Sequence, residues 1–233
     1  VCRTAQADSW AALRRALGST QDLLAVGRWF AGQSHPPAGF ESAWREQVAE
    51  RLAAYRDWVK NDLGRPELAG DAQTFGYRAS VEVAGMVHPV HIIGLNTAWM
   101  CGDDNDALRL WILEQQLMAI ATDLNGLPLS GLRLLLMHHP FEHMADGAAC
   151  RRLLEGHVDL VLRGHLHETE LETWSDPDRT LRQLACGCLY EGGRADQWPN
   201  SCQAISIKCD VAGRPSAVEV RFRTWSGRSM SWH

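Results

Sequence analysis

Residues 132–140 read LRLLLMHHP and residues 158–167 read VDLVLRGHLH. In each stretch a short apolar run, typical of a strand buried on both faces, ends directly at histidines. Residues 145–155, between them, show the pattern of a helix. A strand, a helix and a strand in this order predict two neighbouring parallel strands joined by a right-handed crossover. Because the carboxyl ends of both strands then open at one edge of the sheet, we expect the histidines to meet there.

Further predicted elements surround this unit. Residues 74–83 and 87–96 form the arms of a β-hairpin, and the second arm is apolar enough to be a central strand. Residues 107–124 predict a helix that is followed by an Asn-Gly stop signal. Residues 180–223 alternate and turn in the manner of antiparallel strands.

The first 65 residues are predicted to be helical. Helices are expected over residues 8–17, where Gly18 is the stop signal, and over residues 22–30. A longer amphipathic helix is expected over residues 40–63. Its apolar residues recur at spacings of three and four and predict a buried stripe, made of Phe40, Trp44, Val48, Leu52, Tyr55, Val59 and Leu63.

Length and composition restrict the class of protein. The chain has 233 residues, 45% of them apolar and 22% charged, which suffices for a well-packed globular core. Its formal charge of −5 provides no polybasic field, so binding to nucleic acid or to an anionic membrane is not expected. The sequence shows neither an apolar run of about 18 residues nor the pattern of a secretory leader, so we expect no membrane span. Seven cysteines, without the density of a disulfide scaffold, favour a reducing, cytoplasmic location.

The histidines at the two strand ends have the residue type and the placement of a metal site. His138 and His139 follow the first strand, while His165 and His167 follow the second. Imidazole nitrogens are ligands for borderline divalent metals, and two converging sets favour metal ligands over ordinary polar loop histidines. Gly164 would let the backbone turn sharply before His165 without a Cβ clash.

With these motifs the chain resembles the calcineurin-like metallophosphoesterase family over about residues 74–210. The resemblance rests on His-x-Pro at residues 138–140 and on Gly-His-x-His at residues 164–167, each placed after a predicted strand. The supporting segments are Leu95-Asn96-Thr97, Gln115-Gln116-Leu117, Ala185-Cys186-Gly187 and Pro199-Asn200-Ser201.

This resemblance implies an α/β fold in which a metallophosphoesterase-type β-sandwich is flanked by helices. Residues 1–72 would then be an N-terminal helical segment and a candidate lid. Residues 73–233 would be the C-terminal part of a metallophosphoesterase domain.

The resemblance also implies a dinuclear centre with two divalent metal ions, for which Mn, Fe and Zn are the candidates. His138 and His165 would ligate one ion, and His167 would ligate the other. In the family the two ions activate a bridging water that attacks phosphorus, so the reaction would be hydrolysis of a phosphomonoester or phosphodiester. His139 occupies the variable position of His-x-Pro, where it would face the phosphate-ester substrate, or else lie at the surface or behind a ligand.

Several motifs of the family do not occur in the chain. No Asp-x-His and no Asn-His is present, and residues 102–106 match Gly-Asp-x-x-Asp only at the wrong place in the order of motifs. We interpret residues 102–106 as an acidic loop in solvent. The family order would place Val1 just after the missing half of the site, so we expect this chain alone to be inactive and to need that half. No catalytic acid or base is assigned.

Two other functions stay open. A phosphoesterase fold that has lost its ligands, used as a binding or regulatory module in a larger assembly, would also explain the missing motifs. A metal-dependent nuclease would need a basic channel, which the charge of −5 disfavours. A zinc site of Cys186, Cys188, Cys202 and Cys209 has an unusual spacing, so we predict small buried thiols instead.

Overall fold

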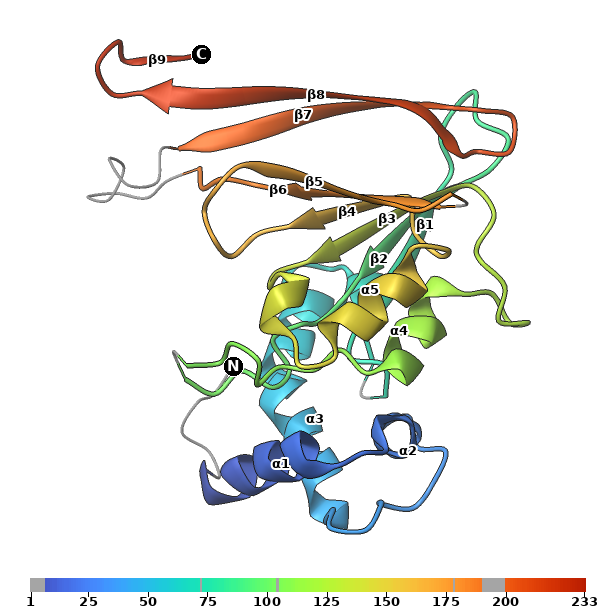
Figure 1. Cartoon of the computed structure of the whole chain (residues 1–233), viewed down its shortest axis with the longest axis vertical. Helices are drawn as coiled ribbons and strands as arrows, with labels where there is room; N and C mark the ends of the chain where they lie inside the picture. Colours follow the sequence, from blue (N-terminus) through green and yellow to red (C-terminus); the bar gives the residue numbers. More distant parts are fainter. Residues whose placement is uncertain (1–6, 72, 104, 178, 190–199) are drawn as a thin grey trace.

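The protein has a mixed α/β fold with two β-sheets (Figure 1). A computed structural model describes residues 7–71, 73–103, 105–177, 179–189 and 200–233. The three-stranded sheet lies over one face of the six-stranded sheet, and helices α4 and α5 lie on the opposite face (Figure 1). The α/β class and the helices near the N-terminus are therefore confirmed. Val1, Pro199 and Asp104 of the acidic loop lie outside the described residues.

The larger sheet contains the predicted parallel unit at its centre. Its strand order is β1-β2-β3-β4-β6-β5, and β2, β3, β4 and β6 run parallel, whereas β1 and β5 are antiparallel edges. In the pairing of β3 with β4, Leu134 lies opposite Leu160 and Met137 opposite Arg163. The strands are β1 (Tyr77–Val81), β2 (Val90–Gly94), β3 (Leu132–Met137), β4 (Leu160–Arg163), β5 (Glu170–Ser175) and β6 (Thr180–Ala185).

The second sheet is antiparallel and consists of β7 (Ser201–Cys209), β8 (Pro215–Ser226) and β9 (Ser231–Trp232). The prediction that residues 180–223 form only antiparallel strands is wrong for β6, which also pairs in parallel with β4. Leu181, Leu184 and Ala185 of β6 are buried, because the strand is covered on both faces as parallel strands usually are. Strand β5 was not predicted, and its mostly exposed residues carry only a weak apolar pattern.

Five α-helices are described in the chain. They are α1 (Ala7–Ser19), α2 (Leu23–Phe30), α3 (Ser42–Asp57), α4 (Glu114–Ala121) and α5 (Gly147–Leu154). A π-helical turn, η1 (Trp58–Asp62), continues α3, and two 3-10 turns are η2 (Pro66–Leu68) and η3 (Phe141–His143). Asp22 caps α2 by accepting the Ala25 N–H at 2.8 Å. Among the described residues no helix has both the length and the apolar character to cross a bilayer.

The stripe predicted on the long helix is buried only in part. Trp44, Val48 and Leu52 are buried in the core, whereas Tyr55 and Leu63 are each 50% exposed. Tyr55 lines a cavity rather than the core. The periodicity therefore located the helix but not the end of its buried face.

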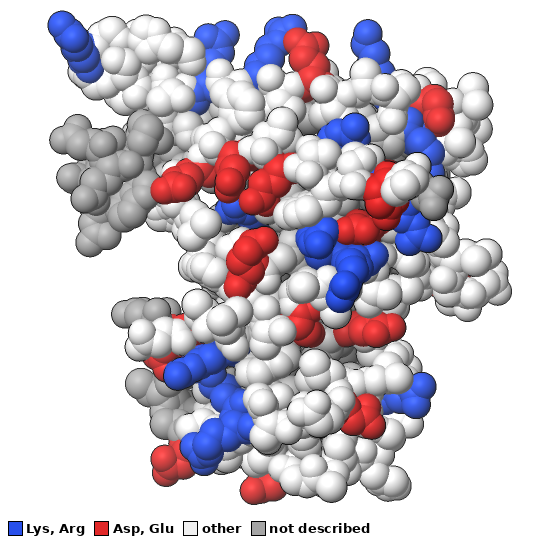
Figure 2. Space-filling model, in the orientation of Figure 1, with Lys and Arg blue, Asp and Glu red and all other residues white. Residues whose placement is uncertain are grey.

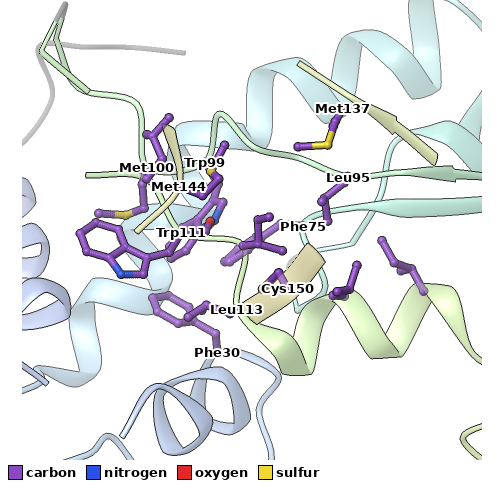
Figure 3. Packing of buried hydrophobic residues seen from close by; sticks show 14 of the residues in the cluster. Phe30, Phe75, Leu95, Trp99, Met100, Trp111, Leu113, Met137, Met144 and Cys150 are labelled. Carbon is purple, nitrogen blue, oxygen red and sulfur yellow. The ribbon is translucent and has the colours of Figure 1, made fainter. Parts of the chain in front are cut away.

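The helices near the N-terminus share one hydrophobic core with the larger sheet. Phe30 of α2 lies edge-on to Trp99, with ring centroids 5.1 Å apart, and Phe75 stacks on Trp99 at 4.7 Å (Figure 3). Trp99 is 1% exposed, and its indole N–H donates to the Trp111 carbonyl. These rings tie the helical segment to the loop that follows β2.

The helix predicted over residues 107–124 is wrong in its first half, because α4 begins only at Glu114. The Asp146 carboxylate accepts the N–H groups of Ile112 and Leu113, at distances from 2.7 to 3.2 Å. Leu113 has a φ of 67°, which a helix does not allow. A buried acidic side chain 33 residues further along the chain thus fixes this segment as a loop.

We expect the substitution Asp146→Ala to lower the free energy of unfolding by about 2 to 3 kcal/mol, because two buried N–H groups would lose their acceptor. Urea denaturation of the purified protein measures this change. Asp62→Ala, at an exposed position, is the control and should leave the unfolding midpoint nearly unchanged. Equal midpoints for the two variants would contradict the role given to Asp146.

Candidate metal site

Three parallel strands deliver polar side chains to one edge of the larger sheet. Thr97 follows β2, His138 and His139 follow β3, and His165 follows β4. Since β2 pairs with β3 and β3 with β4 in parallel, all three carboxyl ends open at this edge. The crossover predicted from the sequence therefore does bring the histidines of both motifs together.

The rings of His138, His139 and His165 form one group, which we call the imidazole cluster. Their centroids are separated by 4.7, 5.1 and 4.5 Å, and one donor atom of each lies within 4.8 Å of the other two. The Nδ1 atom of His165 and the Nε2 atom of His138 are 3.3 Å apart. Two nitrogens on one tetrahedral zinc ion would be about 3.4 Å apart, so this pair has the separation of two ligands of a single ion.

The backbone at the second motif is held in an uncommon conformation. His165 has a φ of 79° and His167 a φ of 58°, in the left-handed region that few residues other than glycine adopt. The turn does not require Gly164 in the way predicted, because its φ is not positive and a Cβ on it would make only an ordinary contact, 3.4 Å from Nδ1 of His138. Conformations of this kind persist where surrounding contacts impose them, and they are frequent at functional sites.

His139 is the most deeply buried member of the cluster, at 7% exposure. Its Nδ1 atom lies 2.9 Å from the Thr97 hydroxyl, which also accepts the backbone N–H of His139 at 3.1 Å. Its Nε2 atom lies 3.7 Å from the sulfur of Cys101. The side chain predicted to face the substrate is thus placed among the donor atoms, with its orientation fixed by Thr97.

His167 does not belong to the imidazole cluster, although its charge lowers the pKa of both His138 and His165. It stays a predicted ligand of a second ion. Within the described part of the chain, the imidazole cluster is the only group of three or more His, Cys, Asp or Glu donors close enough to share an ion.

The cluster is electrostatically suited to bind a cation through neutral rings. Burial lowers the pKa of all three histidines, and the neighbouring histidine charges lower it further. The pKa of His139 falls to about 4. A neutral imidazole keeps the lone pair that a metal ligand needs, so no proton has to be displaced from His139 at neutral pH.

A cavity of about 480 Å³ opens beside the imidazole cluster. Some of the residues that line it were not predicted from the sequence to belong to a site. His143, on the η3 turn, lies edge-on to His165 with centroids 5.1 Å apart. Cys101 and Asp106 reach the cavity from the loop after β2. Only Thr97 and Cys101 could have been anticipated, because they follow a strand that pairs in parallel with β3.

The prediction that residues 102–106 form an acidic loop in solvent is correct for Asp103 but wrong for Asp106. Asp103 has a side chain that is 53% exposed, but the side chain of Asp106 is only 13% exposed and pairs with Arg14 of α1 at 2.7 Å. The Asp106 carboxylate also accepts the N–H groups of Gly102 and Asp103. These contacts therefore anchor the loop beside the cavity.

The described cysteines, from Cys101 onward, are thiols that form no disulfide. Cys186 is exposed, and Cys188, Cys202 and Cys209 are partly exposed, so the prediction that these are buried thiols is wrong. They lie on or next to strands whose outer faces meet solvent. Among the cysteines that the structure describes, only Cys150, in α5, is buried.

No protein-family model matches the chain, and no curated protein matches it.

The low pKa of His139 predicts acid sensitivity in the metal-free protein. Its folded-state pKa of about 4 lies below the ordinary 6.5, so the unfolded chain takes up a proton that the folded chain excludes. Above pH 6.5 neither state is protonated at His139, so the free energy of unfolding is unaffected. As the pH falls from 6.5 toward 4, we expect proton uptake by the unfolded chain to lower the free energy of unfolding by on the order of 2 kcal/mol after solvent screening.

The measurement is urea denaturation between pH 8 and pH 4.5 with a chelator present. His139→Gln keeps a polar partner for Thr97 but does not titrate, so its stability should fall less steeply than that of the wild type. The exposed His35→Ala variant should follow the wild-type curve. Parallel curves for the wild type and His139→Gln would contradict a neutral, buried His139.

Proposed function

We propose that this chain supplies the imidazole ligands of a metal-dependent phosphoesterase that hydrolyses a phosphomonoester or phosphodiester. One observation carries the proposal: donor atoms of His138, His139 and His165 lie within 4.8 Å of one another at the carboxyl ends of two parallel strands. The order of motifs that resembles the calcineurin-like metallophosphoesterases selects this reaction among those of metal hydrolases. The two sheets with helices outside them are compatible with the sandwich of that family.

The donor set fits one ion. Three imidazoles with lowered pKa values suit a borderline divalent ion such as Zn, Fe or Mn. A second ion, as the resemblance implies, would use His167 and further donors outside the imidazole cluster. When bound, a divalent ion polarises a phosphoryl oxygen and lowers the pKa of a water molecule.

The protein groups around the ion would position the phosphate. Thr97 holds His139 in place, and Arg14 keeps the Asp106 carboxylate paired at the cavity rim. The cavity of about 480 Å³ beside the cluster has room for a phosphate and its ester oxygen. His143, edge-on to His165, also lines this cavity, so its ring would face a phosphate bound there.

A small phosphate ester suits the surface better than a nucleic acid does. On the face shown in Figure 2, acidic and basic side chains are intermingled, with no continuous basic stripe. The formal charge of −5 acts against a polyanion in the same way. We therefore favour an esterase for small substrates over a nuclease.

We expect the purified chain to bind about one equivalent of Zn²⁺ or Mn²⁺. His165→Ala removes one of the three donors. Loss of a residue that only supports a metal ligand lowers the affinity by up to about 100-fold, so loss of the ligand itself should lower it by at least that factor. Titration calorimetry and elemental analysis measure affinity and stoichiometry, with His35→Ala as the matched control at an exposed histidine. Equal zinc binding by His165→Ala and by the wild type would contradict the site.

A second candidate is a binding or regulatory module, which the lack of a carboxylate in the imidazole cluster favours. Hydrolysis separates the two. We expect the chain alone to leave bis(4-nitrophenyl) phosphate intact, for want of a bridging carboxylate. A longer product of the same gene that carries Asp-x-His, Gly-Asp and Asn-His motifs should hydrolyse it and lose the activity in the His165→Ala variant. A longer product without these motifs, or one that has them and stays inactive, would favour the module.

A further inference from the structure

A second cavity, of about 390 Å³, lies next to the candidate metal site. We call it the side pocket. His138 and Ala98 line both the side pocket and the cavity of the imidazole cluster, so the two spaces share a wall. A molecule bound at the cluster could therefore extend past His138 into the side pocket.

The lining of the side pocket is mainly apolar, with aromatic rings from separate parts of the chain. Its principal residues are Leu52, Tyr55, Phe75, Tyr77, Leu95 and Met137. Helix α3, strand β1 and the ends of β2 and β3 all contribute to it. Polar groups occur where the pocket approaches the imidazole cluster, on Asn96, Thr97 and His138. The pocket thus has an apolar body and a polar end that faces the cluster.

Two features hold the aromatic rings in fixed positions. Phe75 has a φ of 58°, and its ring stacks on Trp99, at 4.7 Å with an interplanar angle of 21°, and lies edge-on to Phe30, at 5.5 Å. Figure 3 shows Phe75 and Trp99 lying together in the core. The Tyr77 ring lies directly over Gly94, where a Cβ would overlap it. The pocket wall is therefore preformed, which reduces the entropy lost when a ligand binds.

From this geometry we propose that the side pocket binds an aromatic group of the phosphate ester whose phosphate lies at the imidazole cluster. The inference rests on the proposed function and names the substrate class, an ester of phosphate with an aryl or other planar aromatic group. A planar aromatic group fits because the rings of Tyr55, Phe75 and Tyr77, which come from separate parts of the chain, all line the pocket. Leu95 and Met137 complete its apolar surroundings.

The test compares phosphonates, which are not hydrolysed, by titration calorimetry on the zinc-loaded chain. Phenylphosphonate should bind at least about tenfold more tightly than methylphosphonate, as expected for burying one ring. Hexylphosphonate, which is apolar but not planar, should bind more weakly than phenylphosphonate. Equal affinities for phenylphosphonate and methylphosphonate, or tighter binding of hexylphosphonate, would overturn the proposal.

Two variants locate the preference in the side pocket. Leu68 lines the side pocket but not the cavity of the imidazole cluster, so Leu68→Trp should fill the pocket and abolish the preference for the phenyl group while methylphosphonate still binds. Tyr55→Ala, at a half-exposed position that tolerates truncation, should reduce the preference by about fivefold. The controls, neither of which lines the pocket, are Leu63→Trp, at an exposed position, and Trp58→Ala, at 48% exposure against 50% for Tyr55. A preference unchanged in both pocket variants would overturn the proposal.

A separate arm distinguishes failure of the pocket from failure of the proposed function. The metal-free chain is titrated with 4-nitrophenol, which has the ring but no phosphate, and binding is followed by nuclear magnetic resonance. Binding that is lost in Leu68→Trp supports the side pocket even when neither phosphonate binds, and in that case the phosphoesterase function is wrong. If 4-nitrophenol does not bind and the two phosphonates bind with equal affinity, the proposal for the side pocket is wrong. The metal site is then still supported, because both phosphonates bind to the zinc-loaded chain.

Discussion

The parallel pairing of β3 with β4 is the constraint on which the rest of this structure depends. Met137 lies opposite Arg163, so the residues that follow them leave the sheet at the same level. His138 and His165, 27 residues apart in the chain, are thereby brought to a nitrogen separation of 3.3 Å. Were the strands shifted by a single residue, their side chains would point to opposite faces and the imidazole cluster would not form.

Buried polar contacts then hold the loops that surround this edge. Asp146 fixes the segment before α4 by accepting two backbone N–H groups, and Arg14 of α1 fixes the loop after β2 through Asp106. Thr97 orients His139 from the end of β2. Each contact joins distant parts of the chain, and each would be costly to break, since a buried polar group would lose its partner.

Strained residues lie at both cavities. His165, at the imidazole cluster, and Phe75, at the side pocket, have positive φ angles that their surroundings enforce. Phe75 is held by the rings of Phe30 and Trp99, which belong to the shared core. The helical segment at the start of the chain therefore supports the site through packing, even though its own residues carry none of the imidazole ligands.

The sequence by itself determined the strands β2, β3 and β4, the helix between β3 and β4, and the convergence of His138 with His165, because apolar runs and right-handed crossovers are local or nearly local rules. Only the tertiary structure decided that residues 107–113 are not helical, that β6 joins the parallel set, and that His139 and His143 approach His165. It alone placed Asp106 against Arg14 and formed the side pocket from α3, β1 and the ends of β2 and β3. The physical reason is that such contacts depend on how the elements pack at the sheet edge. Periodicity along the chain shows which face of an element is apolar, but it does not show which distant side chain packs against that face.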